Sequence, residues 1–154
     1  MSTDLDQYHA FLATKRFVDP PSGHIVAPEA IHAGLYDFQR AIVRWAIKRG
    51  RAGIFADRGL GKSHMQLAYA QHVPGRTLIV APLAVAQQTV HIAASMGIIV
   101  QYVRHGSEMT EPLCITNYDM LHHFVDARLD GICLDESAAI KHQGAKRRKL
   151  LLEH

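Results

Sequence analysis

The chain has 154 residues, which is enough for one domain with a sizeable core and too few for two ordinary domains. Apolar residues make up 48% of it and charged residues 20%, which is typical of a globular protein and excludes an intrinsically disordered one. The net charge is +3, but residues 141–149 hold five basic residues and no acidic one. The rest of the chain has twelve basic and fourteen acidic residues and therefore a net charge of −2. The basic excess is thus local and does not by itself indicate a nucleic-acid-binding surface.

No stretch approaches the run of about 18 apolar residues that crosses a membrane. The first ten residues, MSTDLDQYHA, also lack the basic and apolar regions of a secretion signal. We therefore expect no membrane contact and a cytoplasmic location. Cys114 and Cys133 each lie within an apolar run, and we expect them to be reduced core residues.

Residues 1–29 are expected to form an N-terminal extension and connector. Leu5, Tyr8, Leu12 and Phe17 follow helical spacing weakly. Three prolines and a glycine between residues 18 and 29 predict an extended connector. The last residues, 152–154, resemble the junction left by an expression tag, and we give them no function.

From residue 37 onward, helix-period segments and short apolar runs alternate. Phe38, Ile42, Trp45 and Ala46 share one face of a predicted helix at 37–49, which Gly50 would end. Short apolar runs predict strands at 53–56, 77–81, 98–102, 113–116 and 132–134, and helical spacing predicts helices at 62–72, 83–95 and 118–127. Buried strands with helical connections favour a parallel sheet, so we predict an α/β domain with a mostly parallel sheet of about five strands.

The segment from Ile54 to Ser63, IFADRGLGKS, matches the phosphate-loop pattern G-x-x-x-x-G-K-[ST], except that Ala56 replaces the first glycine. An apolar run precedes it and a helical pattern follows it. Gly59 and Gly61 would let backbone N–H groups turn toward an anion, and Lys62 would reach the β and γ phosphates. The Ser63 hydroxyl would bind Mg²⁺. The segment predicts a nucleotide site.

Two acidic residues, Asp135 and Glu136, follow the predicted strand at 132–134. Mg²⁺ needs an oxygen ligand opposite Ser63, and Asp135 suits that position. Glu136 would polarise the attacking water. The pair could instead cap a helix, but the phosphate-loop pattern upstream favours the catalytic interpretation.

The chain resembles the Snf2-type ATPases of helicase superfamily 2 over residues 30–151. The block ADRGLGKS resembles their motif I, and LYDFQ at 35–39 resembles their glutamine motif. LIVAPL at 78–83 is similar to motif Ia, ITNYDML at 115–121 to motif Ib, and DESA at 135–138 to motif II. The five blocks occur in the family's order. The short extension and the DESA variant resemble phage-borne members.

The resemblance implies the first RecA-like lobe, a three-layer phosphate-loop domain, of a DNA translocase that couples ATP hydrolysis to movement on duplex DNA. It implies Lys62, Asp135 and Glu136 as catalytic residues and Ser63 and Asp135 as Mg²⁺ ligands. It implies a nucleotide site formed by Phe38, Gln39, Asp57, Arg58, Gly59, Leu60, Gly61, Lys62 and Ser63, with Gln39 reading adenine. It implies DNA contacts from Pro82, Leu83, Thr116 and Asn117, although Pro82 could simply end a strand and Thr116 and Asn117 could cap the next helix.

The sequence departs from the family pattern in two places that bear on function. Ser137 and Ala138 replace the usual Ala-His pair, so the histidine that links the nucleotide to the second lobe is missing. The second lobe and its arginine finger would lie beyond this chain. We therefore expect weak ATP–Mg²⁺ binding and negligible hydrolysis by the chain alone.

Two other functions remain open from the residues: a small phosphate-loop kinase and a nucleotide-binding scaffold without catalysis. The Gln39 block argues against the kinase, and the intact Lys62, Ser63, Asp135 and Glu136 argue against the scaffold. The eleven histidines are scattered and only His122 and His123 are adjacent, so we expect them on the surface rather than in a metal site.

Overall fold

The computed structural model of the chain describes residues 3–15 and 20–136. Sequence predictions that concern Phe17, Val18, Ser137, Ala138, the basic run at 141–149 and the terminal 152–154 lie outside the described residues. The elements in chain order are α1 (Thr3–Lys15), η1 (Pro28–Ala30), α2 (Asp37–Arg49), α3 (Lys62–Ala70), β1 (Thr77–Ala81), α4 (Leu83–Ser95), β2 (Gln101–Tyr102), η2 (Gly106–Glu108), β3 (Leu113–Asn117), η3 (Leu121–Phe124) and β4 (Gly131–Leu134), where η marks a 3₁₀ turn.

The described strands form one parallel sheet in the order β2-β3-β1-β4. The central strand β1 pairs with β3 from Thr77↔Leu113 to Ala81↔Asn117 and with β4 from Thr77↔Gly131 to Val80↔Leu134. All five β1 residues are buried. The α/β class and the parallel sheet are confirmed, with four strands described where about five were predicted.

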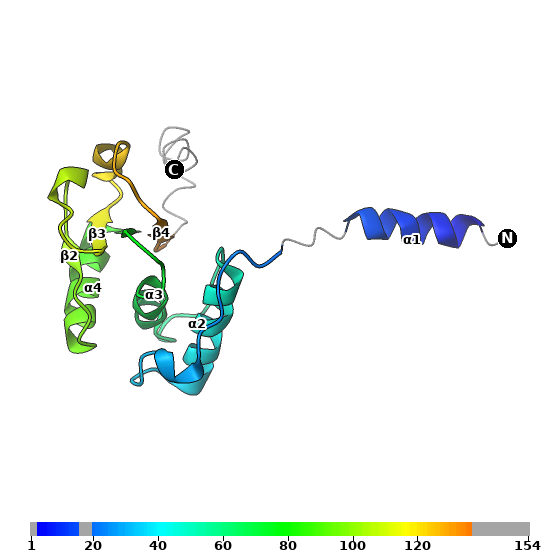
Figure 1. Cartoon of the computed structure of the whole chain (residues 1–154), viewed down its shortest axis with the longest axis horizontal. Coiled ribbons are helices and arrows are strands. Elements are labelled where there is room, and N and C mark those ends of the chain that lie inside the picture. Colours follow the sequence, from blue (N-terminus) through cyan, green and yellow to red (C-terminus); the bar gives the residue numbers. More distant parts are fainter. Residues whose placement is uncertain (1–2, 16–19, 137–154) are drawn as a thin grey trace.

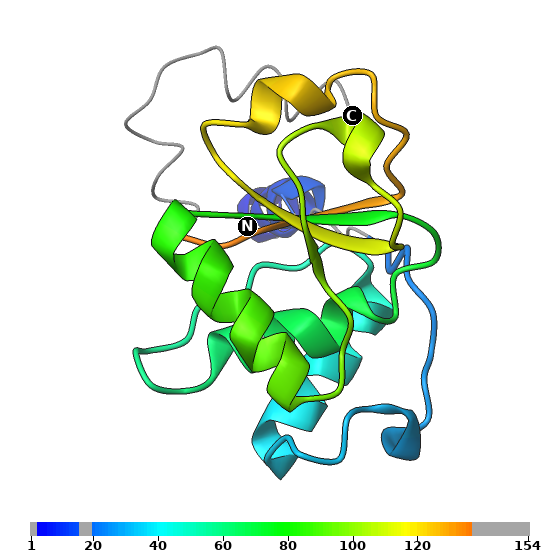
Figure 2. The ribbon, with the colours of Figure 1, turned by 90° about the vertical axis from the view of Figure 1, so that its left-hand side faces the viewer.

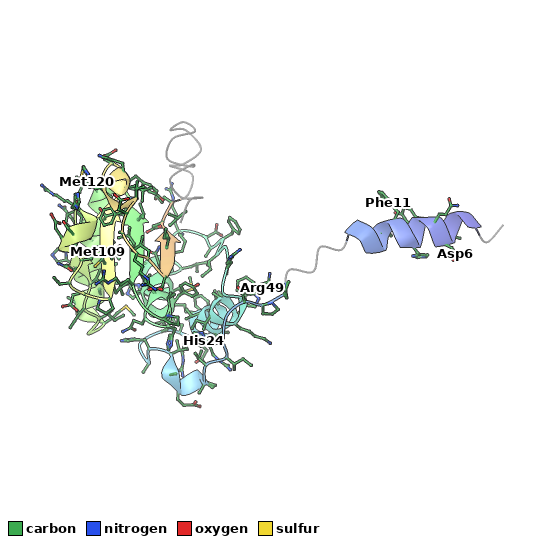
Figure 3. The ribbon with its side chains drawn as sticks, turned by 45° about the horizontal axis from the view of Figure 1, so that its top comes forward. Asp6, Phe11, His24, Arg49, Met109 and Met120 are labelled. Atoms are coloured by element: carbon green, nitrogen blue, oxygen red, sulfur yellow. The ribbon has the colours of Figure 1, made fainter. Side chains whose placement is uncertain are left out.

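Alternate residues of β1 supply two separate cores. Ile79 and Ala81 pack with α3 and α4 on one face of the sheet. Leu78 and Val80 face the other side, where they pack with residues of the segments around η2 and η3, including Phe124. Figure 2 shows α3 and α4 on one side of the sheet and η2 and η3 on the other. Met109 and Met120, labelled in Figure 3, contribute to this second core.

Helix α2 packs outside α3 and forms a third cluster with it, centred on Val43, Ile47 and Met65. Gly50 ends α2 with φ +77°, and its N–H bonds to Ala46 O and Ile47 O. The proline- and glycine-containing connector runs against this end of the helix. Ser22 N–H donates to Arg49 O over 3.1 Å and His24 N–H to Ile47 O over 3.3 Å. The connector from residue 20 is thus part of the packed domain.

The predicted strand at 53–56 is wrong. These residues form no strand, and Phe55 is 98% exposed. An apolar run becomes a strand only where a neighbouring strand offers its backbone groups, and β4 pairs with β1 alone among the described strands. The predicted strand at 98–102 is shorter in the structure, where only β2 forms. Gln101 pairs with Cys114, so residues 98–99 lie opposite the residues before β3. One of these is Pro112, which has no N–H to donate.

The predicted helix at 118–127 is also wrong, because only the 3₁₀ turn η3 forms there. Asn117 Oδ1 accepts the N–H groups of Asp119 and Met120, which starts a tight turn. Leu121 and Phe124 are the residues of η3 that are buried, and their spacing of three suits a 3₁₀ turn.

Helix α1 matches the weak helical signal near the N-terminus (Figure 1). The apolar side chains Leu5, Tyr8, Phe11 and Leu12 of this helix are all exposed. Among the described residues, no helix combines the length and the apolar character needed to span a bilayer.

Replacement of Phe124 tests whether η3 closes the second core. Phe124 has no exposed surface, so Phe124→Ala should lower the free energy of unfolding by about 3–5 kcal/mol. The neighbouring Val125 is 43% exposed, and Val125→Ala should change it by about 0.5 kcal/mol or less. Urea unfolding followed by circular dichroism measures both. Equal effects of the two substitutions would contradict the described packing.

Candidate nucleotide site

The candidate site lies where the loop before α3 meets the carboxyl end of β4. Asp135 directly follows β4, and its N–H bonds to Val80 O of β1 over 2.9 Å. Lys62, the first residue of α3, acts electrostatically on the Asp135 carboxyl group. The tertiary fold therefore brings together two groups that are 73 positions apart in the sequence.

The loop at 57–61 has the backbone conformation that its glycines predicted. Gly59 has φ +80° and Gly61 has φ +74°, both in the region that residues with a side chain rarely adopt. Gly61 precedes the first turn of α3, which begins with Lys62, Ser63 and His64. The unpaired N–H groups and the dipole of a helix start favour an anion at this place.

Lys62 is folded back onto its own loop. Its Nζ donates to Ala56 O and to Asp57 O, each over 2.9 Å. These carbonyl groups hold the ammonium beside the loop, close enough to influence Asp135. An anion in the loop would compete with the two carbonyl groups for the same ammonium.

The Gln39 side chain connects the loop at 57–61 to the start of α2 through hydrogen bonds. The side chain is 5% exposed, its Oε1 accepts from Tyr36 N over 2.9 Å, and its Nε2 donates to Leu60 O over 3.0 Å. A side-chain amide has two N–H donors and two acceptor lone pairs, so it keeps one of each for a base. Gln39 is thus a positioning residue for the loop, and its contact with adenine stays a prediction.

Two aromatic rings stand beside Gln39. Tyr36 and Phe38 are stacked, with ring centroids 6.1 Å apart and an angle of 7° between their planes. Tyr36 is 73% exposed and Phe38 47%. An exposed stacked pair at the start of α2 offers a flat apolar surface of the kind on which a nucleobase packs.

The carboxyl group of Asp135 is half-buried, and burial raises its pKa above the usual value. The negative charge of Glu136 raises this pKa further, whereas the Glu136 N–H and the Lys62 ammonium lower it. Glu136 itself is exposed and has φ +49°, a conformation that costs energy for a residue with a side chain. The chain therefore turns sharply after β4 at the expected catalytic carboxylate.

Tyr118 is a residue of this site that the sequence analysis missed. Its hydroxyl donates to Asp135 O over 2.5 Å. Burial raises the pKa of Tyr118 to about 12, and the nearby Asp135 and Glu136 charges add to this rise. One feature of the sequence could have identified Tyr118: it directly follows the buried strand β3, which is adjacent to β1 in the sheet.

The donor set at the site suits Mg²⁺. Ser63, in the first turn of α3, would supply a hydroxyl and Asp135 a carboxylate oxygen. Mg²⁺ commonly takes one or two protein oxygens and completes its shell with water and phosphate. The described residues contain no group of three His, Cys, Asp or Glu side chains that could hold a metal ion by themselves. A metal here would therefore depend on a bound phosphate.

The expected DNA-contacting residues differ in accessibility. Pro82 is half-buried and Leu83 is 51% exposed, at the start of α4. Thr116 has no exposed surface and Asn117 has 7%. Asn117 caps the turn that follows β3, which was the alternative open from the sequence. In this conformation, of the four residues, Pro82 and Leu83 have surface to offer to DNA.

The remaining loop residues expected to bind nucleotide, Asp57, Arg58 and Leu60, are exposed. Comparisons with protein-family models and with curated proteins find no match to this chain.

Substitution of the two loop glycines separates backbone strain from a steric clash. Alanine at either position must adopt positive φ, which costs about 1–2 kcal/mol. A Cβ at Gly59 would meet nothing within 4 Å, whereas a Cβ at Gly61 would collide with Gln39 Nε2. Gly61→Ala should therefore lower the free energy of unfolding more than Gly59→Ala does. Chemical unfolding compares the two variants.

The double variant Gly61→Ala with Gln39→Ala provides the control for this clash. Removal of the Gln39 amide should cancel part of the extra loss, so the two effects should not add. Strict additivity would show that Gln39 does not contact Gly61.

The Asp135 carboxyl group should make stability depend on pH in the metal-free protein. Because its pKa is raised on folding, its favourable contribution is complete below the ordinary value of 3.8 and is lost as the pH rises through the folded value. Asp135→Asn should therefore raise the free energy of unfolding at neutral pH and give no gain in acid. Urea unfolding at neutral pH and at a pH below 3.8 measures the free energy of unfolding of both chains. Asp57 is exposed, and Asp57→Asn is the control. A gain that is equal at both pH values would contradict the assignment.

Proposed function

We propose that the chain is the ATP-binding lobe of a nucleic-acid-dependent ATPase of the Snf2 type. One observation carries this proposal: a loop with two glycines at positive φ leads into α3, whose Lys62 ammonium is close enough to lower the pKa of Asp135 at the carboxyl end of a parallel strand. Ligands of open parallel sheets bind at that end of the strands.

Each part of the site has a task in binding a nucleoside triphosphate. The N–H groups at the start of α3 would bind phosphate oxygens, and Lys62 would exchange its carbonyl partners Ala56 O and Asp57 O for the β and γ phosphates. The stacked Tyr36 and Phe38 flank Gln39 at the start of α2, and they would pack against the base.

Hydrolysis requires a positioned water and cationic groups around the transferred phosphate. Ser63 and Asp135 would hold Mg²⁺, which would supply positive charge to neutralise the phosphates. Glu136 would orient the attacking water and accept its proton. Lys62 supplies one cation, and the exposed Arg58 is the other cation of the loop. An arginine from a second lobe would complete the set, since its loss costs about 10³–10⁵ in rate.

Movement on DNA would follow from closure of two such lobes on the nucleotide. Pro82 and Leu83 lie at the β1–α4 connection, next to the carboxyl end of β1. A shift of the phosphate loop on hydrolysis would reach this connection through the paired ends of β1 and β4. Duplex DNA is the expected partner, and the proposed coupling moves the lobe without strand separation.

Replacement of Lys62 tests nucleotide binding. ATP analogue with Mg²⁺ should shift the NMR signals of Gly59, Gly61, Ser63 and Gln39 in the unchanged chain. Lys62→Ala removes a charge-assisted bond to phosphate and should weaken the binding about tenfold or more. Lys48 is exposed on α2, and Lys48→Ala removes the same charge elsewhere and should leave the binding unchanged.

The same preparation tests the need for a second lobe. Hydrolysis by the chain alone, with or without duplex DNA, should be negligible although the analogue binds. Fast turnover by the isolated chain would contradict a half-site, and binding that does not depend on Lys62 would contradict the phosphate-loop assignment.

A further inference from the structure

A cavity with several charged residues in its lining lies on the face of the sheet opposite α3. It measures about 520 Å³, which is within the range of small-molecule sites. Its walls come from the residue before β1 and from the segments around η2 and η3, which cover the sheet face away from α3 and α4 (Figure 2). The charged and titratable residues that line it are Arg76, His105, His122, His123, Asp126 and Arg128.

The charge of this cavity favours an anion. Two guanidinium groups, those of Arg76 and Arg128, stand against the single carboxylate of Asp126. Within the part of the chain that the structure describes, neither guanidinium group has an ion pair. The Asp130 carboxylate accepts the Arg76 backbone N–H over 2.8 Å. Both arginine side chains are exposed and therefore able to take a ligand from solvent.

Three imidazole rings add donors to the same cavity. The His122 and His123 ring centroids are 3.8 Å apart, and those of His105 and His123 are 5.3 Å apart. Ser107 N–H donates to His105 Nδ1 over 3.3 Å, so this ring carries its proton on Nε2 when neutral. His105 can thus donate from Nε2 without losing its bond to Ser107.

The crowding of the rings makes the cluster sensitive to an anion. Desolvation and the neighbouring His122 and His105 lower the pKa of His123, because adjacent rings resist carrying charge together. An anion beside His123 would offset this effect and favour the protonated form of His123. Two arginines and the N–H groups of the imidazole rings match phosphate, which is close to a dianion at neutral pH and accepts several hydrogen bonds.

A metal ion is the rival ligand for a histidine cluster, and the geometry disfavours it. No set of three His, Cys, Asp or Glu side chains in the described residues is arranged to hold a metal. The Nδ1 atom of His105 already accepts the Ser107 N–H. Two guanidinium groups beside the rings would also repel a cation.

We propose that this cavity is a phosphate-binding site, separate from the nucleotide loop, in which Arg76 and Arg128 bind the phosphate oxygens and His105, His122 and His123 donate to them. The phosphate belongs either to a small phosphorylated compound or to the backbone of a nucleic acid, which present the same chemistry.

The test uses inorganic pyrophosphate with the Lys62→Ala chain, in which the phosphate loop is disabled, beside the unchanged chain. NMR signals of Gly106, Ser107 and Ala127 and of the imidazole groups should shift in both chains. Binding should tighten about tenfold between about pH 8 and about pH 6, because the bound phosphate favours the protonated form of His123. Survival of the site in Lys62→Ala separates it from the proposed ATP function.

Arg76→Gln with Arg128→Gln should weaken the binding about tenfold or more. The matched control, Lys48→Gln with Arg51→Gln, removes the same charge from exposed positions outside the cavity. The remaining NMR signals report whether each variant is folded. Shifts that stay away from the cavity, no binding at about 10 mM pyrophosphate, or an equal loss in the control would overturn the proposal.

A short DNA duplex then distinguishes the two sources of phosphate. If the duplex shifts the same signals and displaces pyrophosphate, the site supports nucleic-acid phosphate as its ligand. If pyrophosphate binds and the duplex does not compete, the site supports a small phosphorylated compound.

Discussion

The buried central strand β1 is the constraint on which both candidate sites depend. Each N–H and C=O group of a strand buried on both faces needs a partner, so β1 must be paired along both edges. The partners β3 and β4 run parallel to it, which places the carboxyl ends of the three strands at one edge of the sheet. This pairing determines the positions of Asp135 and Asn117, because each lies at the carboxyl end of a strand that pairs with β1.

The same strand separates the two faces on which the sites are built. Residues of β1 alternate between the core under α3 and α4 and the core under η2 and η3. The glycine-containing loop at 57–61 leads into α3 on the first face, and the histidine- and arginine-lined cavity opens on the second. A ligand at one site would therefore contact residues that the other site does not use.

The positions of α2, α4 and the strands β1, β3 and β4 were predictable from the sequence, because helical spacing or a short apolar run marks each of them. The predicted apolar face of α2 was wrong: Phe38 and Trp45 are 47% and 49% exposed. The helix instead buries Val43, Ala46 and Ile47 together with Gln39, because this face packs against α3. The run at 53–56 was wrongly predicted because it has the composition of a strand but no strand beside it. Phe55 is 98% exposed for this reason. The segment 118–127 was wrongly predicted because its apolar spacing also fits a 3₁₀ turn, and the Asn117 side chain, whose bonds are not visible in a pattern, favours that turn. In the site, the glycines and Lys62 followed from their motif, whereas Tyr118 and the anchoring role of Gln39 did not.

The sequence by itself determined the alternation of strands and helices, the positive φ of Gly59 and Gly61, and the presence of Lys62 at the start of α3, because these depend on residues close together in the chain. Only the tertiary structure decided that Lys62 acts on Asp135, that Gln39 holds Leu60, and that Arg76 and Arg128 line one cavity with three histidines. Such contacts join residues that are tens of positions apart, and they arise from strand pairing and helix packing, which composition and spacing along the chain do not specify.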